Sequence, residues 1–89
     1  MKKTKLIQIY GRVQNVGFRY AAVQKANELE IKGFVKNMPD KSVYIEAQGT
    51  DLALEHFLLW CQTGPSWASV TNLVVNEVLA TEFVIFSRK

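Results

Sequence analysis

Apolar and polar positions follow two periods along this chain, and the change from one period to the other separates strands from helices. Branched and aromatic residues at 5–10 predict a first strand, which Gly11 ends. From position 18 the apolar residues recur at spacings of four, four and three, which is the period of a buried helix face. This face consists of Phe18, Ala22, Ala26 and Leu29. The first third of the chain is therefore predicted to be a strand, a loop and a helix.

The next third begins with two strands. Gly33 ends the first helix, 34–37 predicts a second strand, and 38–41 has turn residues. At 42–48 the pattern alternates strictly, with Val43, Ile45 and Ala47 on one side, which is typical of a half-buried strand. These two strands are predicted to form a hairpin.

A second helix and two further strands complete the pattern. Thr50 or Asp51 can cap the helix, and its apolar face consists of Leu54, Phe57, Leu58 and Cys61. The helix ends at the 64–66 break, Gly-Pro-Ser. A fourth strand is expected at 70–78 and a short last strand at 83–86.

The predicted order β-α-β-β-α-β with a short fifth terminal strand is that of a ferredoxin-like α+β sandwich, an antiparallel sheet with two helices on one face. In this arrangement the first and third strands are central, and the first and second strands run the same way. The loop after the first strand and the end of the second strand then meet at one edge of the sheet. We therefore expect Gly11–Arg19 to lie near Asn37.

Length and composition restrict what this fold can be. The chain has 89 residues, of which 48% are hydrophobic, so we expect one domain spanning 1–89. One Cys and one His exclude an internal disulfide framework and make an all-protein zinc site improbable. No apolar run approaches the roughly 18 residues of a membrane span. We expect a cytoplasmic protein that binds no metal and no membrane, with a monomer as the default.

The charge is divided unevenly. Residues 1–41 carry nine basic and three acidic side chains, net +6, whereas residues 42–89 carry two basic and five acidic side chains, net −3. The first half therefore favours an anionic partner, and a small phosphorylated ligand suits this surplus at least as well as a nucleic acid. Solvated surface lysines are the alternative explanation.

The segment Gly11–Arg19 has the chemistry of an anion cradle. It is a loop that enters a helix N-terminus, where the first N–H groups lack internal partners and carry partial positive charge. Arg19 stands in the first turn, where a cation opposes the helix dipole unless an anion lies between them. From spacing alone, a surface charge with a packed stem remains the alternative for Arg19.

These residues resemble the signature of the acylphosphatase family. The match is specific in the loop Gly11-Arg12-Val13-Gln14-x-Val16-Gly17-Phe18-Arg19 and continues in Gly33-Phe34-Val35-Lys36-Asn37. Gly64-Pro65, followed by Ala68 and Val70, also fits the pattern after the second helix.

The resemblance implies hydrolysis of the carboxyl–phosphate bond of small acyl phosphates, with inorganic phosphate as product and inhibitor. It implies no metal, no organic cofactor and no nucleic acid. By this resemblance Arg19 and Asn37 are the catalytic residues: Arg19 holds the phosphate and Asn37 positions the attacking water. The remaining phosphate ligands are backbone N–H groups of Gln14, Asn15, Val16, Gly17 and Phe18. From the residues alone, the preferred interpretation of Asn37 is a strand-end residue that satisfies its own turn.

Two positions depart from the family pattern. Asn15 stands where the family usually has Gly, and if the backbone there needs φ > 0, Asn is the next-best tolerated residue. Asp40-Lys41 replaces a frequent Asp-Gly turn, which affects the hairpin and not the chemistry.

Two other functions fit the same order of elements. One is a catalytically silent anion-binding domain. The other is an RNA-binding module of ferredoxin-like topology, but Val35-Lys36-Asn37 lacks the aromatic residues its signature requires. Among other side chains, His56 is expected at the surface or boundary, Cys61 in inert packing, and Trp60 and Trp67 over the core.

Overall fold

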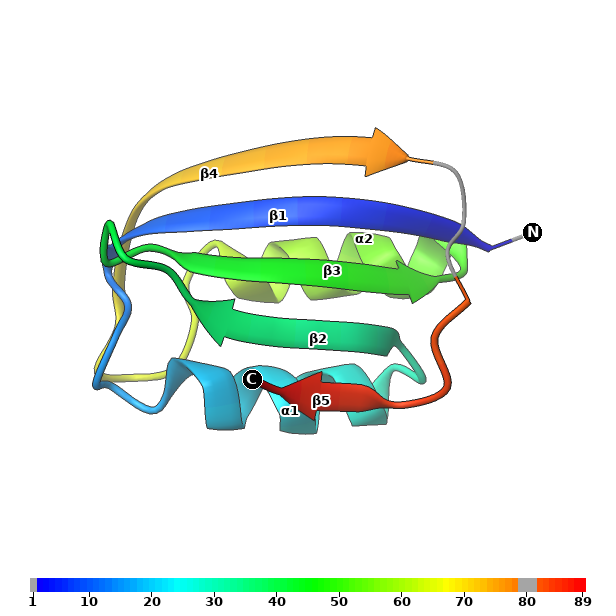
Figure 1. Ribbon diagram of the computed structural model, residues 1–89, viewed down its shortest axis with the longest axis horizontal. Coiled ribbons are helices and arrows are strands. Elements are labelled where there is room, and N and C mark those ends of the chain that lie inside the picture. The colour runs from blue at the N-terminus through cyan, green and yellow to red at the C-terminus, as the bar shows by residue number, and fades with distance from the viewer. Residues whose placement is uncertain (1, 79–81) are drawn as a thin grey trace.

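A computed structural model describes residues 2–78 and 82–89, and its elements follow the predicted order (Figure 1). The fold is the expected ferredoxin-like α+β sandwich, in which both helices lie on one face of a five-stranded sheet (Figure 1). Its elements in chain order are β1 (Lys3–Arg12), α1 (Phe18–Glu28), β2 (Lys32–Asn37), β3 (Val43–Gly49), α2 (Asp51–Cys61), β4 (Ser69–Val78) and β5 (Phe86–Arg88).

The sheet order β4-β1-β3-β2-β5 places β1 and β3 at the centre, as predicted. The pairs β1–β3, β1–β4 and β2–β3 are antiparallel, so β1 and β2 point the same way and end at the same edge of the sheet (Figure 1). The expectation of a fully antiparallel sheet was wrong in one respect. β5 runs parallel to β2, with Phe86 opposite Gly33, so the sheet is mixed.

The last strand also begins later than predicted. Residues 83–85 are not in a strand, and the side chains of Val84 and Ile85 are 84% and 64% exposed. The apolar run at 83–86 suggested a strand by composition, but β5 is an edge strand that has only β2 to pair with. Its ladder starts where Gly33 N–H donates to the carbonyl oxygen of Ile85 at 2.8 Å, and β5 therefore occupies Phe86–Arg88.

The core lies between the sheet and the two helices. Both predicted helix faces are there, although Leu29 and Leu58 are only half-buried. Cys61 is fully buried, and burial raises the pKa of its thiol, which fits inert packing. Trp60 packs against the ring of Phe18 at a centroid distance of 5.3 Å. The fully buried helix residues are Phe18, Ala22, Ala26, Leu54, Phe57 and Cys61.

Trp67 does not cover the core, contrary to the expectation. Its side chain is 79% exposed. It lies in the turns that follow Gly64-Pro65, whereas Trp60, in α2, packs against the rings of Phe18 and Phe57.

The two helices begin differently. At α2 the Thr50 hydroxyl accepts a hydrogen bond from Ala53 N–H at 3.2 Å, so of the two predicted candidates Thr50 is the cap and Asp51 lies in the first turn. At α1 the cap position is Gly17, which offers no side chain, and the first turn contains no acidic residue. The N-terminus of α1 thus keeps its positive partial charge without internal compensation.

None of the helices described is long and apolar enough to cross a membrane.

Candidate active site

The loop between β1 and α1 adopts a backbone that favours anion binding. Asn15 has φ 61° and Gly17 has φ 78°, so both residues are left-handed, as we expected for Asn15 if the loop required φ > 0. Left-handed residues in a tight loop turn successive N–H groups toward one side and form concavities that bind anions. The loop leads directly into the uncapped start of α1, so two sources of N–H donors adjoin one another.

Arg19 and Asn37 line a single small pocket. Its volume is about 80 Å³, which is room for a few water molecules or one small anion. The pocket lies where the loop, the first turn of α1, the end of β2 and β5 meet, so the sequence correctly predicted that the loop and Asn37 would come together. The complete lining is Val13, Asn15, Gly17, Phe18, Arg19, Tyr20, Asn37 and Arg88, which includes two guanidinium groups and no carboxylate.

Phe18 fixes the first turn of α1 against the core. Phe18 is 1% exposed, its ring packs at a tilt of 50° against Trp60, and Gly64 also lies close to the ring. A Cβ at Gly64, where φ is 67°, would come within 2.5 Å of the Phe18 ring. Any side chain at Gly64 would therefore displace Phe18, and with it the backbone that carries Arg19.

The side-chain oxygen of Asn37 is the polar atom that points most directly to a ligand in the pocket. This atom, Oδ1, is buried and has no hydrogen-bond partner among the residues that the structure describes. The turn after Asn37 does not need it, because Met38 N–H donates to Ser42 O at 2.9 Å and Lys41 N–H to Met38 O at 3.0 Å. The side chain therefore does not satisfy its own turn. Buried polar atoms without partners are rare and costly, which points to a ligand or a bound water at this atom.

Arg19 is held at the pocket by the end of the sheet. Its Nη1 donates to the backbone oxygen of Lys89 at 2.7 Å, and the side chain is half-buried. A guanidinium has five N–H donors, so this bond leaves most of them for an anion. The surface-charge alternative for Arg19 does not describe this geometry, because the guanidinium lines the pocket and is anchored there.

Other predicted phosphate ligands lie around this pocket in different ways. Val16 packs its side chain against the core, and Phe18 is buried, so only their backbone N–H groups can serve an anion. Asn15 is exposed on the rim. Gln14 does not line the pocket with Arg19; it lines an adjoining hollow of about 230 Å³ together with Arg12 and Lys41.

Arg88 and Tyr20 also line the pocket, although neither was predicted from the sequence. Arg88 is two positions beyond the buried Phe86 and therefore shares its side of β5, which faces the helices. That pattern alone could not locate it, because its place beside Asn37 depends on the parallel pairing of β5 with β2. Tyr20 follows Arg19 in the first turn and is 59% exposed, so it had no periodic signal.

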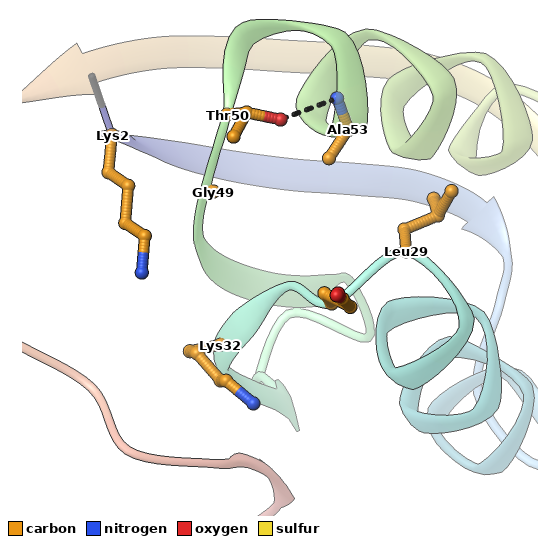
Figure 2. Close-up of a pocket in the computed structure, with 7 residues that line it drawn as sticks. Lys2, Leu29, Lys32, Gly49, Thr50 and Ala53 are labelled. Carbon is orange, nitrogen blue, oxygen red and sulfur yellow. Dashed lines mark hydrogen bonds between the residues drawn. The ribbon is translucent and has the colours of Figure 1, made fainter.

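A larger hollow, of about 410 Å³, lies at the opposite end of the strands, where β3 leads into α2 (Figure 2). Figure 2 shows Lys2 and Lys32 at its border and the bond from Ala53 to Thr50 that already caps α2. It has no buried unpartnered polar atom among the described residues, in contrast to the pocket at Asn37. The remaining residues that line this hollow are Leu29, Glu30 and Gly49.

The described residues also contain no group of three side chains suited to a metal ion.

Comparisons with known proteins agree on one family. The family model described as Acylphosphatase matches residues 5–87. An acylphosphatase of Methylococcus capsulatus is 41% identical over 88 residues, which cover 98% of this chain and 95% of that protein.

Two solved structures of acylphosphatases are also similar to this chain. The crystal structure of acylphosphatase from Bacillus subtilis has a TM-score of 0.92 at 36% identity, covering 100% of this chain and 99% of that one. The structure of an acylphosphatase from Coxiella burnetii has a TM-score of 0.95 at 28% identity, covering 99% and 93%.

The left-handed backbone at Asn15 generates a stability prediction. Asn15→Gly should leave the thermal midpoint unchanged or slightly higher, since relief of strain opposes the greater freedom of the unfolded chain. Asn15→Ala should be the least stable of the three, by about 1 kcal/mol, because a Cβ without the amide tolerates φ > 0 poorly. That corresponds to about 4–8 °C in thermal midpoint for a chain of this size.

Asn27→Ala is the matched control, because Asn27 lies in α1, where alanine is the preferred residue. Its midpoint should not fall. Equal thermal midpoints for Asn, Gly and Ala at position 15 would show that the backbone there is not strained.

Proposed function

The chain belongs to the acylphosphatase family and hydrolyses acyl phosphates to a carboxylate and inorganic phosphate, and we propose that its catalytic residues are Arg19 and Asn37. In this proposal Arg19 and the backbone N–H groups of residues 14–18 hold the phosphoryl group. Asn37 positions the attacking water. The observation that supports it best is Oδ1 of Asn37, which is buried and finds no hydrogen-bond partner in the described part of the chain, in the pocket that Arg19 also lines.

The electrostatics of the pocket suit a dianionic phosphoryl group. Its lining contains the guanidinium groups of Arg19 and Arg88 and no carboxylate. The uncapped α1 N-terminus adds donors with partial positive charge. A planar guanidinium can donate two parallel hydrogen bonds to phosphoryl oxygens, each charge-assisted bond contributing on the order of 1.5–3 kcal/mol. In this proposal Arg88 provides a second positive charge for the phosphoryl group.

The role of Asn37 follows from what an amide can do. An amide does not titrate near neutral pH, so it cannot act as a general base, but its oxygen can accept a hydrogen bond from water. Held in this way, the water attacks phosphorus as the bond between phosphorus and the acyl oxygen breaks. The carboxylate leaves with the bonding electron pair, and both protons of the water end on the phosphate product.

No strong general acid is needed, because a carboxylate is a good leaving group. Phosphoryl transfer then depends mainly on positioning and on stabilisation of charge. The pocket of about 80 Å³ is smaller than the ligand cavities that enclose whole small molecules, so the acyl group lies outside it.

We also infer a monomeric cytoplasmic enzyme with one domain over 1–89 that needs no metal and acts without nucleic acid or membrane. The silent anion-binding domain and the RNA-binding module are not favoured, since curated relatives that match over most of the chain are acylphosphatases.

Hydrolysis should persist when metals are removed. Purified protein should hydrolyse a simple acyl phosphate at the same rate with and without excess chelator, and inorganic phosphate should inhibit competitively. The reason is that backbone N–H groups and guanidinium groups supply the positive charge a metal would otherwise provide. Complete loss of activity on chelation, restored by a divalent ion, would contradict this prediction.

Replacement of Arg19 should remove the phosphate clamp. Arg19→Ala should lower kcat/KM by about 10²–10³-fold and weaken phosphate inhibition, because it removes donors to the transferring group. Arg19→Lys should recover little, since an ammonium cannot supply the two-pronged guanidinium geometry. Steady-state kinetics measure both kcat/KM and phosphate inhibition. Arg12→Lys is the control, because Arg12 is exposed and does not line the pocket. Near-normal kinetics for Arg19→Lys would show that Arg19 is not the clamp.

Replacement of Asn37 should separate turnover from binding. Asn37→Ala should lower kcat by about 10²-fold, the order of effect that loss of positioning has. The phosphate inhibition constant should stay close to that of the wild type, because a residue that orients water acts only in the transition state. A matching loss of phosphate affinity would instead make Asn37 a ligand of the phosphate.

A further inference from the structure

The side chain of Gln14 joins the phosphate loop to the turn that follows Asn37. Its Nε2 donates to Met38 O at 2.9 Å and to Ser42 O at 2.9 Å. A carboxamide nitrogen has two N–H groups, so both are used. Met38 directly follows Asn37, and Ser42 closes the same turn.

The turn that Gln14 holds is internally rigid. Met38 and Ser42 are linked across it by a backbone bond of 2.9 Å, and Ser42 is 1% exposed. Asp40 Oδ1 accepts hydrogen bonds from the Ser42 hydroxyl and from Ser42 N–H, which lower the pKa of the Asp40 carboxyl. Gln8 on β1 donates to the Ser42 hydroxyl at 3.2 Å. A bond to this turn therefore fixes the position of the backbone at Asn37.

The sheet does not supply this connection. Pairing of β1 with β3 stops at Ile9 and Val43, whereas pairing of β1 with β4 continues as far as Arg12. The loop is thus attached to β4, on the side away from β2. Within residues 2–78 and 82–89, Gln14 makes the only hydrogen bonds or ion pairs between residues 13–17 and residues 38–42.

We propose that Gln14 is a positioning residue, whose side chain sets the distance between the anion-binding loop and the water held by Asn37. This inference rests on the proposed function of Arg19 and Asn37. Gln14 does not line the pocket of about 80 Å³, so its side chain acts through the turn and not on the substrate. In-line attack is sensitive to such a distance, since a misplacement of about 1 Å can cost about 10²-fold in rate.

The first test uses Gln14→Met, which keeps an unbranched side chain of similar length and removes both donors. kcat for a simple acyl phosphate should fall about 10- to 100-fold. The inhibition constant of inorganic phosphate should stay near the wild-type value, because the loop N–H groups and Arg19 remain. Gln62→Met is the matched control, since Gln62 is exposed at the end of α2, and it should change neither quantity.

A second test measures the pH dependence of kcat for Gln14→Glu, and it does not require that the Gln14→Met variant folds well. An ionised carboxylate facing two carbonyl oxygens is disfavoured, so its pKa should lie above the usual value of about 4.3. Above that pKa the side chain cannot donate. Below it the protonated acid offers one O–H and restores one of the two bonds. The ratio of variant to wild-type kcat should therefore rise as the pH falls through this pKa.

A double-mutant cycle with Asn37→Ala separates this inference from the proposed function. If Gln14 acts through Asn37, Gln14→Met should cost little further kcat in the Asn37→Ala background. If Asn37→Ala alone keeps wild-type kcat, the proposed function fails. If Asn37→Ala is slow but Gln14→Met adds its full loss, only the positioning role fails.

Three results would overturn the positioning role directly. One is unchanged kcat in Gln14→Met. Another is an equal loss of kcat and phosphate affinity, which would show that Gln14 only supports the anion cradle. The third is a ratio for Gln14→Glu that does not vary with pH.

Discussion

The N-terminus of α1 imposes the constraint on which the site depends. No side chain caps it, its first turn contains no acid, and Arg19 adds a full positive charge beside its partial ones. Nearby, Oδ1 of Asn37 is buried without a hydrogen-bond partner among residues 2–78 and 82–89. Each feature by itself is unfavourable. A phosphoryl group with a water molecule resolves both, since the anion takes the N–H and guanidinium donors while the water donates to Asn37.

The remainder of the fold holds these unfavourable groups in place. Phe18, enclosed by Trp60 and Gly64, anchors the first turn of α1 to the core. β2 carries Asn37 to the same edge of the sheet, where β5 adds Arg88 and holds Arg19 through Lys89. Gln14 spans the gap between loop and turn. Positioning thus comes from buried packing and from side-chain hydrogen bonds to backbone oxygens rather than from ion pairs, because the ion pairs found in the described residues all lie outside the pocket lining.

The sequence predicted whatever depends on local periodicity and on the specific loop motif. Helix faces, the hairpin, the cap at Thr50 and the meeting of the loop with Asn37 were confirmed, and Asn15 has the left-handed backbone that its replacement of Gly suggested. Features set by tertiary pairing were missed. The parallel register of β5 determines both its start at Phe86 and the place of Arg88, and no pattern within 83–89 encodes it. The exposure of Trp67 was missed as well, because Trp67 lies in a turn, where no period indicates which side faces the core.

The most direct measurement is a high-resolution crystal structure of the protein with inorganic phosphate bound. The account predicts phosphate oxygens within hydrogen-bond distance of the loop N–H groups and the Arg19 guanidinium. It also predicts an ordered water on Oδ1 of Asn37, placed in line with phosphorus. Phosphate bound instead between Lys2 and Lys32 in the hollow of Figure 2, with Asn37 still unpartnered, would contradict it.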